Sequence, residues 1–351
     1  MVKSNSNNAH LLVIRLSSMG DVAMTVPVIL ALTQQYPNVN ITLLTRGFFK
    51  PMFSHISNVR VYEIELNGRH KGVRGLWRLY KELKALNIDA VADMHNVLRS
   101  NILKSYFGLG KIPFVQIDKG RKEKKALTAP QKKVFEPLKT THQRYADVLA
   151  KLGYEINLQK VALLAKRQLS GKTLQIVGTD TKKWLGIAPF AAYQGKMYPL
   201  ELMQTVVGNL NQDNKYKILL FGGGKKEIAQ LNYLSNAMDN VINVSGKLSF
   251  EEELELISNL DLMLSMDSAN AHLAAMFAIP VLTLWGVTHP YAGFLPFGAE
   301  MQNTLLANRE QYPMVPTSVY GNKLPKGYER AMETITPQEI LLKIDLLINK
   351  K

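Results

Sequence analysis

The 351-residue sequence contains no cysteine, which excludes disulfides, cysteine-ligated zinc and thiol catalysis. No apolar run reaches the roughly 18 residues that a membrane-spanning helix needs, so none is predicted. Residues 1–10 are polar and lack the apolar core of a signal peptide, so export is not expected. The dinucleotide fingerprint Gly-x-Gly-x-x-Gly is absent, and no Gly-Lys-Ser/Thr follows the first predicted strand. The two commonest nucleotide-binding loops are therefore not predicted.

Negative charge is scarce, because 43 lysines and arginines face 28 acidic residues and give a formal net charge of +15. Such an excess indicates an anionic partner: nucleic acid, a membrane surface or a phosphorylated substrate. The cations gather in two clusters, over residues 69–81 and 119–144. Alternatively, most of these cations bind no partner and belong to a solvated helix face and a solvated loop. A content of 46% hydrophobic residues predicts a folded protein.

Short apolar runs alternate with segments of helical spacing along the whole chain. Strands are predicted at 11–16, 41–45, 59–64, 90–94, 185–189, 216–221, 241–244, 260–264 and 281–286. Helices are predicted at 22–36, 75–86, 141–152, 200–210, 226–238, 271–277 and 335–348, with a further helix starting at the capping-box pattern Ser249 to Glu252. Residues 111–141 are interpreted as a long, mobile, basic connection. The alternation predicts an α/β fold of two doubly wound halves facing across a cleft.

The stretch 265–275 places polar side chains where a small-residue helix begins after a buried strand. Asp267, Ser268 and Asn270 stand at that turn, where free backbone N–H groups and the helix dipole favour an anion. Alternatively, Asp267 or Ser268 only caps the helix. A comparable turn, 17–21, follows the first strand, and its Gly20 permits close approach of a ligand to the backbone.

These two turns resemble motifs of the heptosyltransferases of lipopolysaccharide assembly, glycosyltransferase family 9. Residues 13–22, VIRLSSMGDV, are similar to the family's opening "IRLSSLGDV", and residues 267–275, DSANAHLAA, are similar to its "D-[ST]-G-x-x-H-L-A-A". Between them, residues 196–199, KMYP, resemble a "K-x-W-P" element, with Tyr198 where Trp is usual. The resemblance implies a GT-B fold and inverting, metal-independent sugar transfer from a nucleotide-activated donor.

The resemblance also assigns roles to residues. Asp21 is the expected base, with a helix cap as its alternative, and Lys196 is the expected diphosphate clamp, with a solvated loop lysine as its alternative. Donor binding is expected from Gly20, Gly222, Glu227, Asp267, Ser268, Ala269, Asn270 and His272. For Glu227 a solvent-facing helix terminus, and for His272 a buried core position, are the alternatives. Acceptor binding is expected from Arg69, Lys71, Arg74 and Arg99, because the family's acceptors are anionic.

The resemblance implies an N-terminal acceptor domain over 1–165, a C-terminal nucleotide-sugar domain over 166–335 and a terminal helix over 336–351, with packing on the N-terminal domain as one option for that helix. The expected reaction transfers a sugar, heptose from ADP-heptose by family frequency, onto an anionic lipopolysaccharide-core acceptor, without a cofactor or metal. The expected place is the cytoplasmic face of the inner membrane, as a peripheral protein, with no nucleic-acid partner. Ala191, Ala192 and Ala269 depart from the family pattern. A different nucleotide-sugar, a catalytically silent nucleotide-binding relative and a basic nucleic-acid-binding protein are the alternatives.

Overall fold

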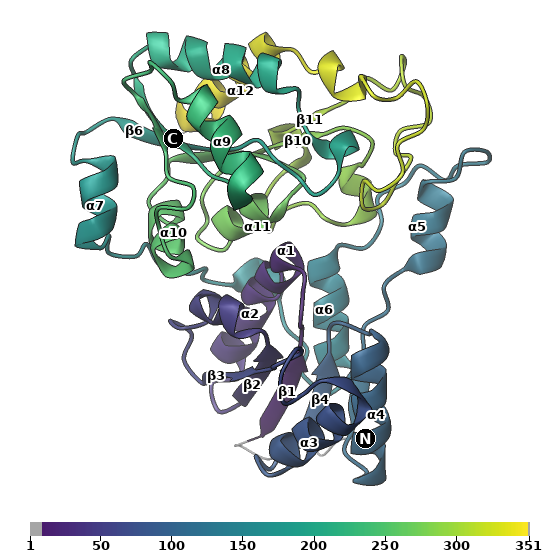
Figure 1. Ribbon diagram of the computed structural model, residues 1–351. Coiled ribbons are helices and arrows are strands. Elements are labelled where there is room, and N and C mark those ends of the chain that lie inside the picture. The colour runs from purple at the N-terminus through teal and green to yellow at the C-terminus, as the bar shows by residue number, and fades with distance from the viewer. Residues whose placement is uncertain (1–8, 350–351) are drawn as a thin grey trace. The chain divides into compact units, whose positions relative to one another are not determined.

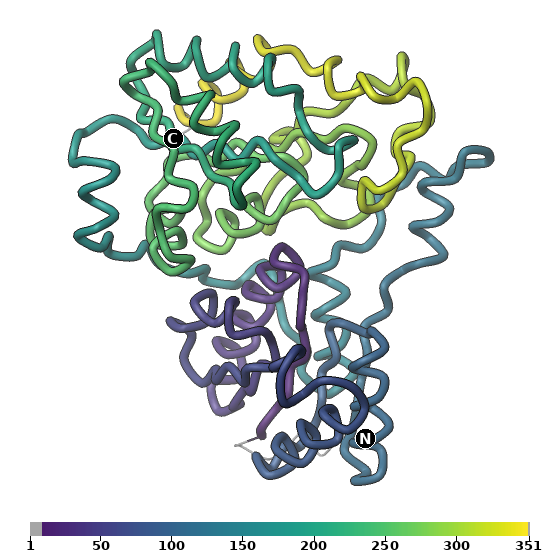
Figure 2. Tube along the Cα trace, in the orientation of Figure 1, coloured from purple at the N-terminus to yellow at the C-terminus, as the bar shows by residue number. Residues whose placement is uncertain are grey.

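The computed structural model describes residues 9–349, which form two compact α/β units (Figure 1). The first unit comprises the chain up to Lys119 together with Thr141–Leu163, and the second comprises Gly120–Thr140 together with the chain from Leu164 onward. The Cα trace therefore passes between the units three times (Figure 2). The sequence assigned residues 120–140 to the first domain, whereas their contacts belong to the second unit.

The first unit is built on a five-stranded parallel sheet of order β3-β2-β1-β4-β5. Its strands are β1 (His10–Ile14), β2 (Asn40–Thr45), β3 (Val59–Glu63), β4 (Ala90–Asp93) and β5 (Phe114–Gln116). Its helices are α1 (Met19–Ala23), α2 (Val26–Gln35), α3 (Gly72–Lys84), α4 (Leu98–Leu109) and α6 (Thr141–Ala150), with short 3-10 turns at Gly47–Met52 and Leu158–Lys160. This strand order is that of a doubly wound sheet.

Apolar residues on one face of this sheet bury against two helices. Leu12 and Ile14 of β1 join a core with Leu79 of α3 and Phe107 of α4. That shared core places α3 and α4 on one face of the sheet.

The single helix predicted at 22–36 is instead two helices, because Pro27 stands in the first turn of α2 and lacks the N–H that a continuous helix would need.

The second unit is built on a six-stranded parallel sheet of order β11-β10-β9-β6-β7-β8. Its strands are β6 (Lys183–Ala188), β7 (Tyr216–Leu220), β8 (Val241–Asn243), β9 (Leu262–Met266), β10 (Val281–Trp285) and β11 (Thr304–Leu306). Its helices are α5 (Arg121–Leu127), α7 (Gly171–Val177), α8 (Leu200–Gln212), α9 (Gly224–Leu234), α10 (Phe250–Ile257), α11 (Ala269–Ala275) and α12 (Pro337–Asn349), with 3-10 turns at Gln194–Lys196, Pro290–Ala292, Met301–Asn303 and Ala331–Thr334. The predicted capping box at α10 is confirmed, because Ser249 N donates to Glu252 Oε2 at 2.7 Å and Glu252 N donates to Ser249 Oγ at 3.3 Å.

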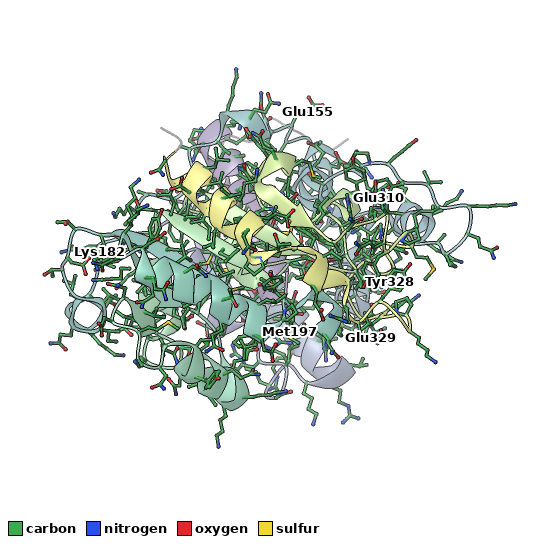
Figure 3. All side chains as sticks on the ribbon, turned by 90° about the horizontal axis from the view of Figure 1, so that it is seen from above. Glu155, Lys182, Met197, Glu310, Tyr328 and Glu329 are labelled. Atoms are coloured by element: carbon green, nitrogen blue, oxygen red, sulfur yellow. The ribbon has the colours of Figure 1, made fainter. Side chains whose placement is uncertain are left out.

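The terminal helix α12 belongs to the core of the second unit. Ile340 and Ile344 are fully buried in the same cluster as Val206 and Leu210 of α8, and Figure 3 shows α8 and α12 side by side, with Met197 just before α8. The sequence raised packing on the N-terminal domain as an option for this helix, and these contacts are those with its own unit. The apolar face of α12 is occupied within its own unit.

The basic connection predicted at 111–141 contains regular structure, namely β5 and α5. Lys124 of α5 is buried with its ammonium 4.1 Å from the centre of the Phe294 ring, and Leu138 N donates to Tyr291 O at 2.9 Å. The side chain of Lys133 reaches the carbonyl oxygens of Met314 and Pro316 at 2.7 and 2.6 Å. These contacts fix the segment to the second unit. Among residues 9–349 no helix is long and apolar enough to span a membrane.

Candidate active site

Three of the predicted site residues, Asp21, Lys196 and Asp267, follow strands at which a sheet reverses its strand order. In the first unit the reversal lies between β1 and β4, and in the second between β6 and β9. Open parallel sheets bind ligands just beyond the carboxyl ends of the strands at such a point. Asp21 follows β1, Lys196 follows β6 and Asp267 follows β9. Each unit thus carries candidate residues at its own switch point.

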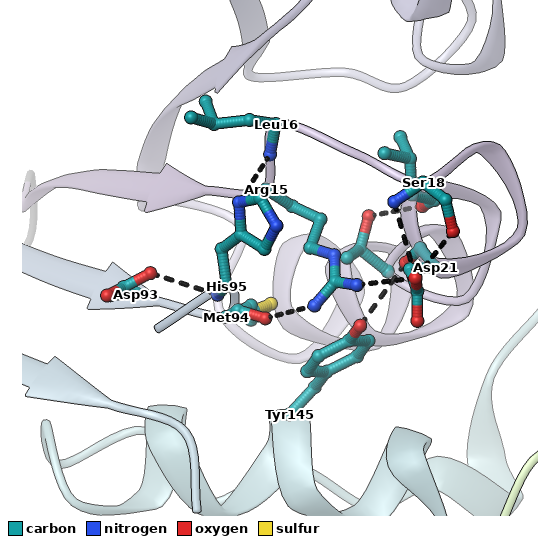
Figure 4. A network of polar contacts seen from close by, with 10 residues as sticks. Arg15, Leu16, Ser18, Asp21, Asp93, Met94, His95 and Tyr145 are labelled. Atoms are coloured by element: carbon teal, nitrogen blue, oxygen red, sulfur yellow. Dashed lines mark hydrogen bonds and ion pairs between the residues drawn. The ribbon is translucent and has the colours of Figure 1, made fainter. Parts of the chain in front are cut away.

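Asp21 lies on α1 with its carboxylate held by Arg15 and Ser18 (Figure 4). Its Oδ2 atom lies 2.6 Å from Arg15 Nη2, and it accepts hydrogen bonds from Ser18 Oγ at 2.6 Å and from Ser18 N at 3.3 Å. The alternative, that Asp21 is the N-cap of the helix, is wrong in position, because the N-cap of α1 is Ser18. Asp21 is the third helical residue, and the bond from Ser18 N makes it part of a capping box. The Asp21 side chain keeps 28% of its surface exposed, so it is accessible to a substrate while its orientation is fixed.

Arg15 is buried and forms the support beneath Asp21. Its Nη1 donates to the Met94 carbonyl at 2.7 Å, and its guanidinium lies 5.9 Å from the centre of the Tyr145 ring. Burial disfavours the guanidinium charge, but Tyr145 and Asp21 outweigh this effect and raise the pKa of Arg15. The Tyr145 hydroxyl donates to the backbone carbonyl of Asp21 at 3.3 Å. The turn carrying Asp21 is therefore tied to β4 and to α6.

His95 is buried next to this network and was not predicted as a site residue. Its Nδ1 accepts a hydrogen bond from Leu16 N at 3.4 Å, and its backbone N–H donates to the Asp93 carboxylate at 2.9 Å. Burial, followed by the charges of Arg15 and Lys119, lowers the pKa of His95 to about 3. His95 is therefore neutral at physiological pH. The signal available in the sequence was its position directly after the strand β4.

Lys196 and Asp267 form a buried ion pair in the second unit. The Lys196 ammonium lies 2.9 Å from Asp267 Oδ2, and the two side chains are only 13% and 8% exposed. The same carboxylate oxygen accepts a hydrogen bond from Thr288 Oγ1 at 2.9 Å. The alternative for Lys196, a solvated loop lysine, is excluded by this pairing. The pair joins the loops that follow the two switch-point strands β6 and β9.

Glycine and tyrosine residues shape the Lys196 loop. Gly321 has a φ of +88°, and a Cβ atom there would lie 2.4 Å from Lys196 Cδ, so the lysine stem passes directly over that glycine. Tyr198, where Trp is usual in the family motif, is buried, and its hydroxyl donates to the Ile335 carbonyl at 2.7 Å. Burial raises the pKa of Tyr198 well above the usual range. The tyrosine thus fills an apolar position and satisfies its own polar atom.

The turn before α11 brings four of the predicted donor residues together. Ser268 occupies the N-cap position, but its side chain makes no cap hydrogen bond, and its hydroxyl lies 3.1 Å from Ser265 Oγ. Ala269 and Asn270 form the first turn of α11, whose N–H groups point away from the helix body. His272 is buried on the same helix, which agrees with the alternative of a buried core position.

The remaining predicted donor residues lie in α1 and after β7. Gly20 is the second residue of α1. Gly222 lies two residues after the end of β7, and a Cβ there would lie 2.9 Å from Leu231 and 3.2 Å from Glu227 Oε2. Glu227 is half-buried in the first turn of α9 and accepts a hydrogen bond from Gly223 N at 2.8 Å. This bond gives Glu227 a role at its own helix terminus.

A pocket of about 460 Å³ opens at the carboxyl edge of the first sheet. Its lining includes Arg46 after β2, the residues 64–68 after β3, and Arg99 at the start of α4. Arg99 was predicted as an acceptor residue, whereas Arg46 was missed although it also follows a strand. Two guanidinium groups in one hollow suit a carboxylate or phosphate.

The other three predicted acceptor residues lie outside the lining of this pocket. Arg69 pairs with Glu65 at 3.0 Å and lies 3.9 Å from Glu82. Lys71 occupies the N-cap position of α3 without a cap hydrogen bond from its side chain, Arg74 lies in the first turn, and both are exposed. In residues 9–349 no group of three or more histidines and carboxylates is arranged to hold a metal ion.

The two α/β units, each with a parallel sheet and a strand-order reversal, define the GT-B fold class, and solved structures share this fold. A glycosyltransferase family 9 structure from Veillonella parvula matches at 18% identity over 98% of both chains with a TM-score of 0.75. The ADP-heptose lipopolysaccharide heptosyltransferase II of Escherichia coli matches at 20% identity over 97% of this chain and 98% of that chain, with a TM-score of 0.68. The predicted α/β, GT-B fold class is confirmed.

Sequence comparison gives the family. The lipopolysaccharide core heptosyltransferase OpsX of Haemophilus influenzae is 25% identical over 288 residues, which cover 80% of each chain. The family model described as glycosyltransferase family 9 (heptosyltransferase) matches residues 76–323. The chain belongs to glycosyltransferase family 9, a family of heptosyltransferases.

Proposed function

We propose that this protein transfers heptose from ADP-heptose, with inversion, onto an anionic acceptor of the lipopolysaccharide core. The buried pair of Lys196 with Asp267, at a sheet switch point and beside the first turn of α11, carries the proposal. A cation beside free helix N–H groups suits a diphosphate. The solved relative from Escherichia coli bears ADP-heptose in its name, which supports the choice of donor.

The reaction needs a proton acceptor and a cation. The acceptor hydroxyl oxygen forms a bond to the anomeric carbon, its proton passes to Asp21, and the bond from that carbon to the diphosphate oxygen breaks to release ADP. Arg15 and Ser18 hold the Asp21 carboxylate in one orientation. Lys196 offsets the charge that develops on the departing diphosphate. Because Lys196 supplies that cation, we propose that transfer needs no metal ion.

For the acceptor, we propose that Arg46 and Arg99 bind its anionic groups in the pocket of the first unit. The pocket lies at the same edge of the sheet as Asp21, because both follow the carboxyl ends of its parallel strands. Arg69, Lys71 and Arg74 add positive charge next to it on the loop before α3 and in its first turn. We propose a peripheral place at the cytoplasmic face of the inner membrane, where a lipid-linked acceptor resides.

The decisive experiment follows nucleotide release from ADP-heptose with a deacylated core acceptor, in buffer containing EDTA. We expect ADP release that depends on acceptor, and a thermal stabilisation by ADP that GDP, UDP and CDP do not reproduce. Stabilisation by a different nucleotide would exclude the proposed donor. Nucleotide binding without transfer to any acceptor would instead identify a silent relative. Loss of turnover in EDTA that added Mg²⁺ restores would refute metal independence.

A further inference from the structure

The outer surface of α3 and α4 in the first unit carries exposed cations and exposed apolar side chains together. On α3 the exposed side chains are Val73, Arg74, Trp77, Arg78, Lys81 and Lys84. On α4 and just after it they include Leu98, Arg99, Lys104, Leu109 and Lys111. We call this set the α3–α4 face. It was only partly visible in the sequence, as the cation cluster at 69–81.

The two helices present this face to one side of the unit. Both bury their inner residues in a single core cluster against one face of the sheet. The Trp77 ring packs edge-on against Tyr106 of α4, with ring centres 5.0 Å apart, so the helices are in direct contact. Their exposed sides therefore point away from the sheet together, and Figure 1 shows α3 and α4 next to each other.

The charge of the α3–α4 face is of one sign. Glu82 is the sole acidic residue of α3, and it is occupied by Tyr62 and His70 at 2.5 and 2.9 Å, while α4 contains none. Within residues 9–349, Arg78, Lys81 and Lys84 form no ion pair in the structure. The Lys81 ammonium lies 5.7 Å from the centre of the Trp77 ring, so cation and aromatic ring are presented together.

The apolar part of the face is unusually accessible. Leu98 and Leu109 are each 75% exposed, Val73 is 61% exposed and Trp77 is 39% exposed. A helix surface that combines aromatic and aliphatic side chains with lysines and arginines is typical of attachment to an anionic bilayer surface. A nucleic acid would match the charge but offers no apolar layer for the leucines and the valine.

We propose that the α3–α4 face attaches this protein to an anionic lipid bilayer. The proposal rests on the proposed function for its biological setting, since a lipid-linked acceptor must be reached at a membrane. It also separates this face from the basic segment 119–139, the other region of dense positive charge. In that segment Lys124 is buried against Phe294, so fewer of its cations are available.

The test is co-sedimentation with phosphatidylcholine vesicles that contain or lack phosphatidylglycerol. The variant Arg78→Gln/Lys81→Gln/Lys84→Gln removes three exposed cations that have no assigned role in catalysis or sugar binding. Each cation near an anionic surface is worth about a fivefold change in partitioning, so we expect binding to fall about 100-fold. The matched control, Arg121→Gln/Lys122→Gln/Lys125→Gln on α5, removes the same charge and should stay within about threefold of the wild type.

A second pair of variants tests the apolar contribution. Val73→Ser/Leu109→Ser should abolish the vesicle binding that persists at high salt, whereas Leu342→Ser/Leu346→Ser on α12, with 68% and 64% exposure, should leave it unchanged. The Trp77 fluorescence should shift to the blue on vesicle binding. Equal losses in the α3 and α5 variants, or binding to random duplex DNA that is tighter than to vesicles, would overturn the inference.

The two proposals fail in different ways. If Arg78→Gln/Lys81→Gln/Lys84→Gln loses vesicle binding but keeps turnover of a water-soluble, deacylated acceptor, both stand. If that triple variant loses vesicle binding, and the wild type binds vesicles but neither binds ADP nor transfers heptose, the attachment face stands and the proposed function fails. Unchanged vesicle binding overturns the attachment face whatever the turnover. Melting temperatures equal to that of the wild type establish that the variants are folded.

Discussion

Arg15 Nη2 lies 2.6 Å from Asp21 Oδ2, so the candidate base is held by a buried cation that directly follows the strand β1. The arginine is anchored in turn by the Met94 carbonyl of the neighbouring strand segment. The orientation of the Asp21 carboxylate therefore depends on Arg15, which is itself buried and bound to the backbone next to β4.

Replacing Asp21 with asparagine should remove the proton acceptor and keep the shape of the turn. We expect kcat to fall by about 10² to 10⁴, the usual contribution of a positioned base. Thermal stabilisation by ADP should not change, because the predicted donor residues other than Gly20 lie in the other unit. Steady-state kinetics and a thermal shift with ADP measure the two effects. Wild-type turnover in Asp21→Asn would remove Asp21 from the mechanism.

Replacing Lys196 with methionine should leave the buried Asp267 carboxylate without its cation. Breaking one side of a buried pair costs about 3 to 5 kcal/mol of unfolding free energy, and urea denaturation measures it. The double variant Lys196→Met/Asp267→Asn should recover most of that stability and still lack activity. Equal activity of the wild type and Lys196→Met would contradict the clamp assignment.

Substituting Gly321 with alanine tests how closely Lys196 must pack. The new Cβ would lie 2.4 Å from Lys196 Cδ, at a φ of +88° that alanine adopts only with strain. Gly327 is a matched control, because its φ is +86° and nothing lies within 4 Å of its added Cβ. We expect both variants to lose about 1 to 2 kcal/mol of stability from backbone strain. Only Gly321→Ala should also raise the KM for the donor, and a similar KM in both would argue against the contact.

His95 should make the protein less stable in acid. Its pKa is about 3 in the folded state against 6.5 for the free side chain, so between those values the unfolded chain takes up a proton that the folded chain does not. Unfolding free energy should therefore fall as pH drops below about 6.5, by up to about 1.4 kcal/mol per pH unit. His95→Gln keeps an acceptor for Leu16 N and should remove that share of the slope. Denaturant titrations from pH 7 to 4 measure it.

His289 has to be considered in the same experiment, because burial and the charges of Arg309 and Lys133 lower its pKa to about 4. The slope remaining in His95→Gln is expected to come in part from this residue. The double variant His95→Gln/His289→Gln should be flatter still. An unchanged slope in His95→Gln would show that this histidine does not titrate as its environment indicates.

The alternation of strands and helices was predictable because each element carries its own apolar spacing, as at 41–45 and 200–210. The two motif turns were predictable because their polar residues directly follow strands. The ion pair of Lys196 with Asp267 was not, since it depends on β6 and β9 being neighbours although they lie about 75 residues apart. Sequence spacing alone cannot report which strands become adjacent.

Arg46 and α5 were missed for related reasons. Arg46 joins Arg99 in one pocket only because β2 and β4 flank β1, and an isolated arginine after a strand carries no signal of its own. In α5, dense positive charge concealed a helix whose Lys124 is buried on Phe294, a partner far along the chain. The local composition of this segment predicted a solvated loop, whereas its contacts with residues far along the chain form an ordered helix.

The assignment of Gly120–Thr140 to the second unit has a consequence for biosynthesis and for protein engineering. Neither unit is one continuous stretch of chain, so no single cut releases either of them whole. A fragment ending before Leu164 would contain the segment Gly120–Thr140 but lack Tyr291 and Phe294, the residues that this segment contacts in the second unit. During synthesis on the ribosome, this segment can make those contacts only after more than 150 further residues have been translated.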